Sequence, residues 1–303
     1  MAARPPDRRI LLAFAATVLI AGSNIVAVRL SNRELDPFWG AGIRFALGSA
    51  ILWILVATRG ERLPARGDRS GPVVYGLLSF LLAYAFFYWG AQEVPAGLGG
   101  TIMASVPLMT VILAAAHRLE PLRGRAVAGA LVAMAGVAAM SSSALSGDVG
   151  VVSVLAIVAA AAAAAEAGVV LQLLRAAHPI VTNAIGMAVG AAGLLVLSLA
   201  ARETWRFPQS GSVWAAVVYL VVASPVLFML LVYVIRRWSA SAASYQFVLF
   251  PVVAVIGGAV VLDEPITASL VLGAPLVLAG VYVGALTGDR PRPRSISAAP
   301  VQR

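Results

Sequence analysis

The chain contains no cysteine and no lysine, and it carries few charged residues of any kind. The absence of cysteine excludes a disulfide framework and a metal site built from thiolates. Charged residues make up 12% of the sequence and hydrophobic residues 61%, whereas soluble domains carry about 25% charged and roughly 45–50% apolar residues. So little polar surface cannot cover a water-facing globule, and the composition therefore predicts an integral membrane protein.

Because lysine is absent, all 22 basic residues are arginines, and the net charge is +9. Such a charge would indicate a nucleic-acid partner for a soluble protein. Here most arginines fall between long apolar runs, where they set the orientation of membrane helices, so we expect no nucleic-acid partner. With the N-terminus inside, the outer loops hold only Arg29, Arg33, Arg202 and Arg206, whereas most of the other arginines fall in cytoplasmic segments. This bias predicts that both termini are cytoplasmic, in a multi-pass protein of the cell inner (plasma) membrane.

Ten apolar stretches are long enough to cross a bilayer, which takes about 17–25 residues. Continuous runs of this kind predict helices, because a backbone in lipid must satisfy its own hydrogen bonds. We interpret the first run as a retained helix and not as a cleaved signal peptide. The expected fold class is an all-α integral membrane protein of ten transmembrane helices. The stretches are Ile10–Leu30, Pro37–Thr58, Gly71–Gln92, Ala96–His117, Arg125–Ser141, Gly150–Arg175, Pro179–Ala201, Ser212–Ile235, Ser239–Leu262 and Ile266–Leu286.

The two halves of the chain resemble each other in sequence. Five spans is an odd number, so a second copy must enter the membrane from the opposite side. We therefore predict a 5+5 inverted repeat over residues 1–143 and 144–286, followed by a disordered cytoplasmic tail over residues 287–303. Inverted repeats are typical of alternating-access carriers, whose substrate site lies near the midplane between the copies. At a shift of 144 residues the clearest matches are Pro107 with Pro251 and Glu120-Pro121 with Glu264-Pro265.

Three features together resemble the drug/metabolite transporter superfamily, EamA type. They are Gly22-Ser23-Asn24 in the first span, the Glu-Pro pair after spans four and nine, and the five-plus-five layout. The resemblance covers roughly residues 10–286, although Ala21 stands where the family usually has tryptophan. Among members, the chain is most similar to bacterial aromatic amino-acid exporters (YddG-like). This resemblance implies export of small metabolites such as neutral or aromatic amino acids, with a multidrug or lipid-type exporter of the same fold as the alternative.

Polar residues inside the spans are the candidate substrate-binding residues, because they are costly in a membrane unless they face a cavity or a partner. Asn24 in span one aligns with Glu166 in span six, so the repeat predicts that the two border one cavity. Glu166 is interpreted as a ligand for a substrate ammonium group or as a proton carrier. The alternative is a protonated acid that hydrogen-bonds a neighbouring helix.

Spans four and nine carry further candidates beside matched prolines. Thr101 and Ser105 share one face of span four, and Tyr245 and Gln246 lie in span nine. Gln246 offers both donors and an acceptor, with an interhelical hydrogen bond as the alternative role. Three prolines are expected to kink helices and to take part in gating; these are Pro107, Pro225 and Pro251.

Span three is rich in aromatic residues, and Tyr84 and Tyr88 are spaced to share a face. They are predicted to stack on an aromatic or cationic group, with lipid contact or packing as the alternative. Ser224, beside Pro225, is expected to line the path. Arg44 lies inside span two and could pair with Asp36, bind a carboxylate or snorkel outward, and we favour snorkelling.

No motif of a membrane-embedded enzyme is present: the sequence has no H-E-x-x-H helix, no G-x-S-x-G and no pair of acids at membrane depth. His117 and His178 fall at the ends of their spans, too far from the centre for a buried metal pair. We therefore expect no catalytic residues, no metal and no cofactor. The expected partners are a small-molecule substrate, such as an amino acid or similar metabolite, and membrane lipid, around a monomer.

Overall fold

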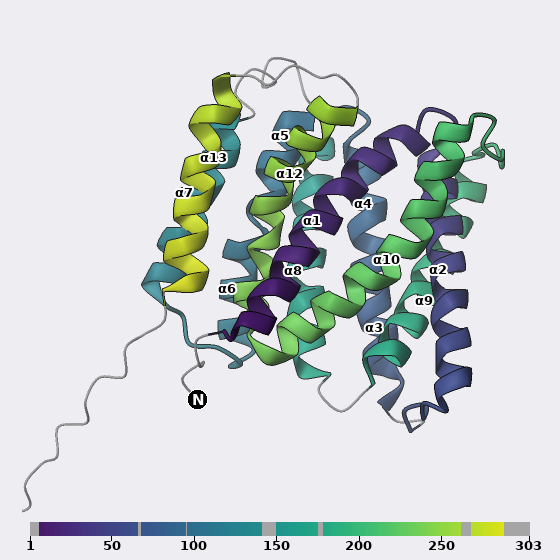
Figure 1. The fold of residues 1–303 in the computed structure, drawn as a ribbon, viewed down its shortest axis with the longest axis horizontal. Helices are drawn as coiled ribbons and strands as arrows, with labels where there is room; N and C mark the ends of the chain where they lie inside the picture. The colour runs from purple at the N-terminus through teal and green to yellow at the C-terminus, as the bar shows by residue number, and fades with distance from the viewer. Residues whose placement is uncertain are drawn as a thin grey trace, which may run out of the picture.

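The computed structural model describes residues 6–65, 68–94, 96–140, 150–174, 178–261 and 268–287, and all regular structure in these ranges is helical (Figure 1). Eight helical stretches are long and apolar enough to cross a membrane, and two apolar helices, Gly124–Met140 and Val271–Leu286, are shorter. The prediction of an all-helical membrane protein is confirmed. The elements are α1 Arg8–Ser31, α2 Pro37–Arg59, α3 Ser70–Gly76, η2 Leu77–Leu82, α4 Ala83–Gly90, α5 Ala96–Met103, α6 Val106–Ala116, α7 Gly124–Met140, α8 Val151–Leu173, α9 Pro179–Ala200, α10 Gly211–Arg237, α11 Ala240–Ser244, α12 Gln246–Val261, α13 Ala268–Val281 and η4 Tyr282–Leu286.

Four of the predicted spans are not uniform α-helices, and the tenth is one of them because it ends in the π-helical turn η4. The third is continuous from α3 to α4 but adopts π-helical geometry in η2. The fourth is divided into α5 and α6 by a turn, and Pro107 lies in the first turn of α6. The ninth is divided into α11 and α12 at Tyr245, whereas Pro251 lies inside α12. The two interruptions therefore fall at different distances from the matched prolines.

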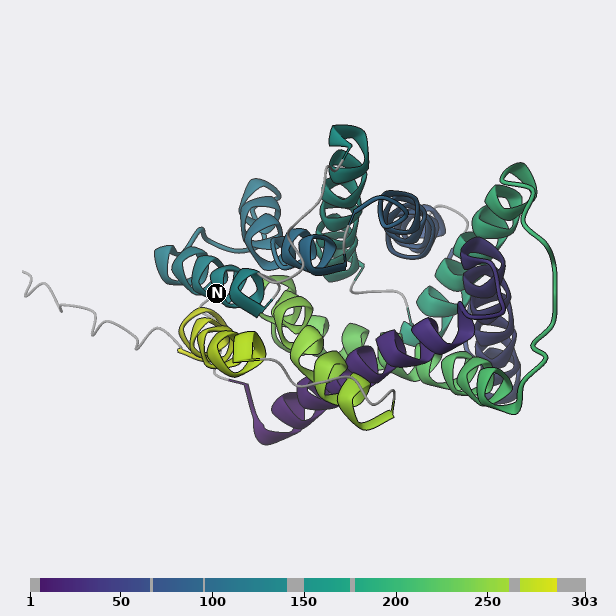
Figure 2. The ribbon, with the colours of Figure 1, turned by 90° about the horizontal axis from the view of Figure 1, so that it is seen from above.

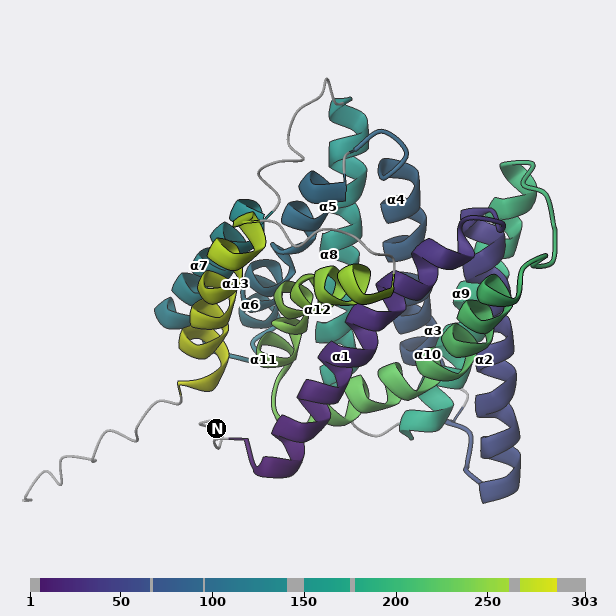
Figure 3. The same cartoon turned by 45° about the horizontal axis from the view of Figure 1, so that its top comes forward.

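Helices α7 and α13 pack so closely that their backbones touch. A Cβ atom added to Gly129 would lie 2.5 Å from the Gly284 Cα, and one added to Gly136 would lie 2.9 Å from the Gly273 carbonyl oxygen. Residues later in α7 thus meet residues earlier in α13, which means that the two helices are antiparallel. The pair forms one edge of the molecule in Figures 1 and 3.

The opposite edge is formed by α2 and α9, which are also antiparallel (Figures 1 and 3). The Ser49 hydroxyl donates to the Ala184 carbonyl, 2.8 Å away, across this contact. On the same helix, Gly190 leaves room for Phe80, whose Cβ would clash with a Cβ added at this glycine. Small residues in α9 and α13 thus let helices of this chain pack closely on their neighbours.

The loop between α1 and α2 is joined to the loop between α9 and α10 by carboxylates from both sides. Glu203 accepts hydrogen bonds from the backbone N–H groups of Phe38 (3.0 Å) and Trp39 (2.7 Å), which belong to the first turn of α2. In return, Asp36 accepts from the N–H and the hydroxyl of Thr204, at 2.7 and 2.8 Å. We call these reciprocal bonds of Asp36, Glu203 and Thr204 the clasp. An acid at a helix N-terminus is stabilising, so the clasp fastens the two edge helices at this end.

Glu34 adds a pH-sensitive bond beside the clasp. Its carboxylate accepts from the N–H groups of Gln209 and Ser210, and hydrogen bonds from Ser210 and Gln209 hold its pKa below the usual value of a glutamate. A carboxyl group with a depressed pKa stabilises the folded state above its unfolded pKa, and this contribution is lost as pH falls through the folded value.

We therefore expect Glu34→Gln to lower the thermal unfolding temperature in detergent at neutral pH. The difference from wild type should decline as pH falls below about 4.5 and vanish only once the pH lies below the depressed folded pKa. The matched control is Asp68→Asn, since the Asp68 side chain is exposed and makes no hydrogen bond within the described residues. Equal unfolding temperatures for Glu34→Gln and wild type at neutral pH would show that this bond contributes nothing.

Candidate functional site

Arg44 is buried inside the bundle, with an exposure of 3%. Its guanidinium carbon lies 4.4 Å from the centre of the Phe45 ring and 5.2 Å from that of Tyr84, and it interacts electrostatically with the Tyr88 hydroxyl. The expectation that Arg44 snorkels outward is wrong, because the side chain turns toward aromatic rings of the interior. Pairing with Asp36 is not found either, since that carboxylate binds Thr204.

Two nitrogens of Arg44, Nε and Nη2, are buried and have no hydrogen-bond partner. Guanidinium groups stay charged in proteins, and a charged donor that is buried without a partner costs more than an ordinary unsatisfied group, which itself costs about 1–3 kcal/mol. Arg44 is therefore a buried charged group with two unsatisfied hydrogen-bond donors.

A cluster of aromatic rings surrounds Arg44. Phe45 contacts Phe80 at a centroid distance of 5.1 Å and Tyr84 at 4.9 Å. Tyr84 and Tyr88 are 5.9 Å apart, so they share a face as the sequence predicts, and the cationic group over Tyr84 is the protein's own Arg44. We call Phe45, Phe80, Tyr84 and Tyr88 the aromatic cluster.

Glu166 forms an ion pair that the sequence did not predict. Its Oε1 lies 3.0 Å from Nε2 of His117, the residue that ends α6. The other carboxylate oxygen, Oε2, is buried and has no partner. The sequence placed His117 at the end of a span, too far from the centre for a buried metal pair. The interruption of span four and the packing of α6 on α8 nevertheless bring it beside Glu166.

Asn24 lies in α1 with its Oδ1 buried and unpartnered. Helix α1 packs on α10 and α12, whereas α8, which carries Glu166, packs on α4 and α6. Figure 2 shows α1 and α8 on opposite sides of the bundle. That Asn24 and Glu166 border one cavity stays a prediction.

The structure places the other predicted residues at contacts between helices, in hydrogen bonds within their own span, or at buried or partly exposed positions. The Tyr245 hydroxyl donates to the Ala126 carbonyl at 2.7 Å, and its ring is fully buried; the structure therefore uses this hydroxyl to join α7 to the α11–α12 junction. The Ser105 hydroxyl donates to the Ile102 carbonyl at 2.6 Å, within its own span. Ser224 and Gln246 are buried, at 1% and 5% exposure. Thr101 lies in α5, where its side chain is partly exposed.

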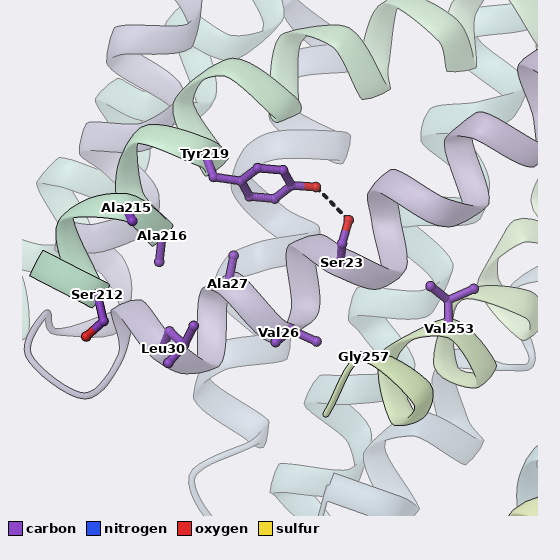
Figure 4. Close-up of a pocket in the computed structure, with 10 residues that line it drawn as sticks. All are labelled: Ser23, Val26, Ala27, Leu30, Ser212, Ala215, Ala216, Tyr219, Val253 and Gly257. Carbon is purple, nitrogen blue, oxygen red and sulfur yellow. Dashed lines mark hydrogen bonds between the residues drawn. The ribbon is translucent and has the colours of Figure 1, made fainter. Parts of the chain in front are cut away.

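Two surface grooves are apolar and are not lined by these polar residues. The first, of about 310 Å³, lies between α1, α10 and α12, and its two facing hydroxyls, Ser23 and Tyr219, bond each other at 2.5 Å (Figure 4). The second, of about 330 Å³, lies between α2 and α10 and includes Pro225. Neither is lined by a predicted substrate-binding residue. Within the described ranges, no three metal-ligating side chains come together.

Apolar helices of membrane-spanning length that enclose charged and amide groups define a multi-pass membrane transport protein. The EamA-like transporter family model matches residues 8–142 and, separately, residues 151–285. The chain therefore belongs to the EamA-like transporter family, and it is a transporter of small molecules and not an enzyme.

Relatives with known names agree with this assignment. The chain is 25% identical to an uncharacterized transporter of Archaeoglobus fulgidus, over 90% of this chain and 97% of that protein. It is 26% identical to the uncharacterized inner membrane transporter YedA of Escherichia coli, over 80% of this chain and 79% of YedA. It is 29% identical to a probable terminal-alkyne amino-acid exporter of Streptantibioticus cattleyicolor, but over 43% of each chain.

The fold itself occurs in a solved crystal structure. That structure superposes with a TM-score of 0.80 and a sequence identity of 21%, and the match covers 93% of this chain and 98% of the other. At this identity the likeness concerns the arrangement of the helices alone.

Proposed function

We propose that the protein exports neutral or aromatic amino acids, or closely similar metabolites, across the inner membrane by alternating access. The observation that carries this proposal is that several buried polar atoms within the spans lack a hydrogen-bond partner, among them Oδ1 of Asn24, Nε and Nη2 of Arg44, and Oε2 of Glu166. Unsatisfied polar groups inside a membrane protein are retained where they face a substrate path.

The packing of the helices supports the 5+5 inverted repeat that alternating access uses. The contacts of α1 with α10 and α12 have counterparts in those of α8 with α4 and α6, as an exchange of the two halves would require. The helices expected to be equivalent, α2 with α9 and α7 with α13, pack on each other and run in opposite directions. Both facts favour two copies with opposite insertion, and the separate family matches to residues 8–142 and 151–285 are in keeping with them.

An amino-acid substrate is supported by the resemblance to aromatic amino-acid exporters and by the partial match to the terminal-alkyne amino-acid exporter. The test is counterflow of radiolabelled L-phenylalanine in proteoliposomes, with unlabelled amino acids, sugars and cationic drugs as competitors. We expect neutral and aromatic amino acids to compete. Competition by sugars or cationic drugs, together with none by amino acids, would overturn the substrate assignment and leave the fold intact.

The two apolar grooves favour the alternative of a lipid or multidrug exporter, because apolar molecules could enter there from the membrane. A lipid-scrambling assay on the same proteoliposomes distinguishes the two functions. Scrambling without amino-acid counterflow would favour the alternative.

The pair of Glu166 and His117 is the candidate for proton coupling, because both side chains can exchange protons. We expect Glu166→Gln to flatten the dependence of the transport rate on pH, because the variant removes one of the two side chains that can exchange protons. The control is Glu93→Gln, whose carboxylate accepts a hydrogen bond from Ser153 at the end of another span. Unchanged transport with an unchanged pH profile in Glu166→Gln would remove this pair from any coupling role.

A further inference from the structure

We infer that Arg44 and the aromatic cluster form a binding site for a small organic carboxylate that carries an apolar or aromatic group. This inference rests on the proposed function, since it assigns the substrate class of the same interior. It starts from the burial of Arg44, whose exposure is 3%.

The unpartnered atoms of Arg44 have the geometry that a carboxylate needs. Nε and Nη2 are adjacent nitrogens on one side of the guanidinium, so their N–H groups point side by side. A planar carboxylate accepts two such parallel hydrogen bonds, and these bidentate bonds are among the strongest in proteins. Both nitrogens are buried without a hydrogen-bond partner, and the Tyr88 group that interacts with this guanidinium is a hydroxyl and not a carboxylate.

The protein does not supply the anion itself within its described part. Among the described residues, Asp36 and Glu203 form no ion pair with Arg44; their carboxylates instead accept from Thr204 and from Phe38 and Trp39. The rings of Phe45 and Tyr84 face the Arg44 charge, but a cation–π contact satisfies no N–H group. A bound carboxylate would neutralise the charge and satisfy both nitrogens at once.

The surroundings of Arg44 select among anions. A phosphate carries up to two charges and strong hydration, which a single arginine among aromatic rings cannot compensate. A carboxylate carries one charge, and the partly exposed rings of Tyr84 and Tyr88 can pack against an apolar or aromatic group attached to it. The geometry thus favours an aryl or alkyl carboxylate over inorganic phosphate.

Binding to the full-length protein in detergent tests the site with four probes: L-phenylalanine, phenylacetate, L-phenylalaninamide and inorganic phosphate. Isothermal titration calorimetry should show binding of the two carboxylates, with the amide bound at least about tenfold more weakly because it has lost the bidentate charged acceptor. Phosphate should not bind. Equal affinity for L-phenylalanine and its amide would overturn the inference, and so would binding of phosphate in preference to phenylacetate.

The variants are Arg44→Lys, Arg44→Met and, as a matched control, Arg59→Lys at the exposed end of the same helix. Arg44→Lys keeps the charge but removes the fork, so phenylacetate should bind at least about tenfold more weakly, whereas Arg59→Lys should bind as wild type does. Arg44→Met should abolish binding and raise the unfolding temperature, because it removes a buried charge that has no partner. Wild-type affinity in Arg44→Met would overturn the inference.

The outcomes separate this inference from the proposed function. Counterflow of amino acids and of their amides at equal rates would refute a role for Arg44 while the carrier assignment stands. Binding of phenylacetate that depends on Arg44, in a protein without amino-acid counterflow, would refute the proposed substrate while the carboxylate site stands.

Discussion

Gly129→Ala is expected to destabilise the protein strongly, whereas the chemically identical change Gly168→Ala is expected to be neutral or stabilising. An added Cβ at Gly129 would lie 2.5 Å from the backbone N and Cα of Gly284 and 2.6 Å from the Gly280 carbonyl oxygen. Backbone atoms cannot rotate away as a flexible side chain can, so α7 and α13 must move apart. Forcing extra atoms into a packed contact costs about 1–3 kcal/mol and occasionally more.

At Gly168, in the interior of α8, an added Cβ meets no atom within 4 Å. Alanine there gains about 1 kcal/mol of helix propensity over glycine. Thermal unfolding of both variants in the same detergent provides the comparison, and their unfolding free energies should differ by about 2–4 kcal/mol. A Gly129→Ala protein as stable as Gly168→Ala would mean that α7 and α13 do not touch as closely as described.

Locking the clasp is expected to stop transport. Because the chain has no cysteine, the pair Asp36→Cys and Thr204→Cys would carry its only two thiols, at positions whose side chains are in hydrogen-bonding contact. A short bifunctional thiol reagent with a reducible centre would join the two loops covalently. If the ends of α2 and α9 must separate during alternating access, the joined protein cannot complete the cycle.

We expect counterflow by the bridged protein to fall to the level of protein-free vesicles and to recover after reduction. Each single-cysteine variant, treated with the same reagent, controls for modification alone. Full transport by the bridged protein would show that the clasp stays closed throughout the cycle, and opening would then have to occur elsewhere.

The sequence was sufficient to predict the class of fold, because apolar composition and the length of the apolar stretches identify membrane helices. The positions of α1, α2, α8, α9 and α10 follow the predicted spans closely. The interruption at Tyr245, which precedes Pro251 by more than a turn, could not be located in this way. Proline marks where a helix loses a hydrogen bond, but the place where the chain actually turns depends on packing, here on the bond from Tyr245 to Ala126.

The candidate site was only partly legible in the sequence. The spacing of four residues placed Tyr84 and Tyr88 on one helix face. Arg44 was recognised as an arginine that lies well inside a span. Its direction could not be read, because a guanidinium on a long side chain reaches either the membrane surface or the interior. The partnership of His117 with Glu166 depends on how α6 lies against α8, and contacts between distant segments leave no local pattern.

The contacts α2–α9 and α7–α13 lie at opposite edges of the molecule (Figure 1). Between them α1 packs on α10 and α12, and α8 packs on α4 and α6, so the bodies that could move are groups that mix helices from both halves of the chain. Two rigid bodies that remain attached at two points can turn relative to each other only about the line through those points. Here that line would cross the molecule from edge to edge and act as a hinge. Movement about such a hinge would widen the bundle at one end and narrow it at the other.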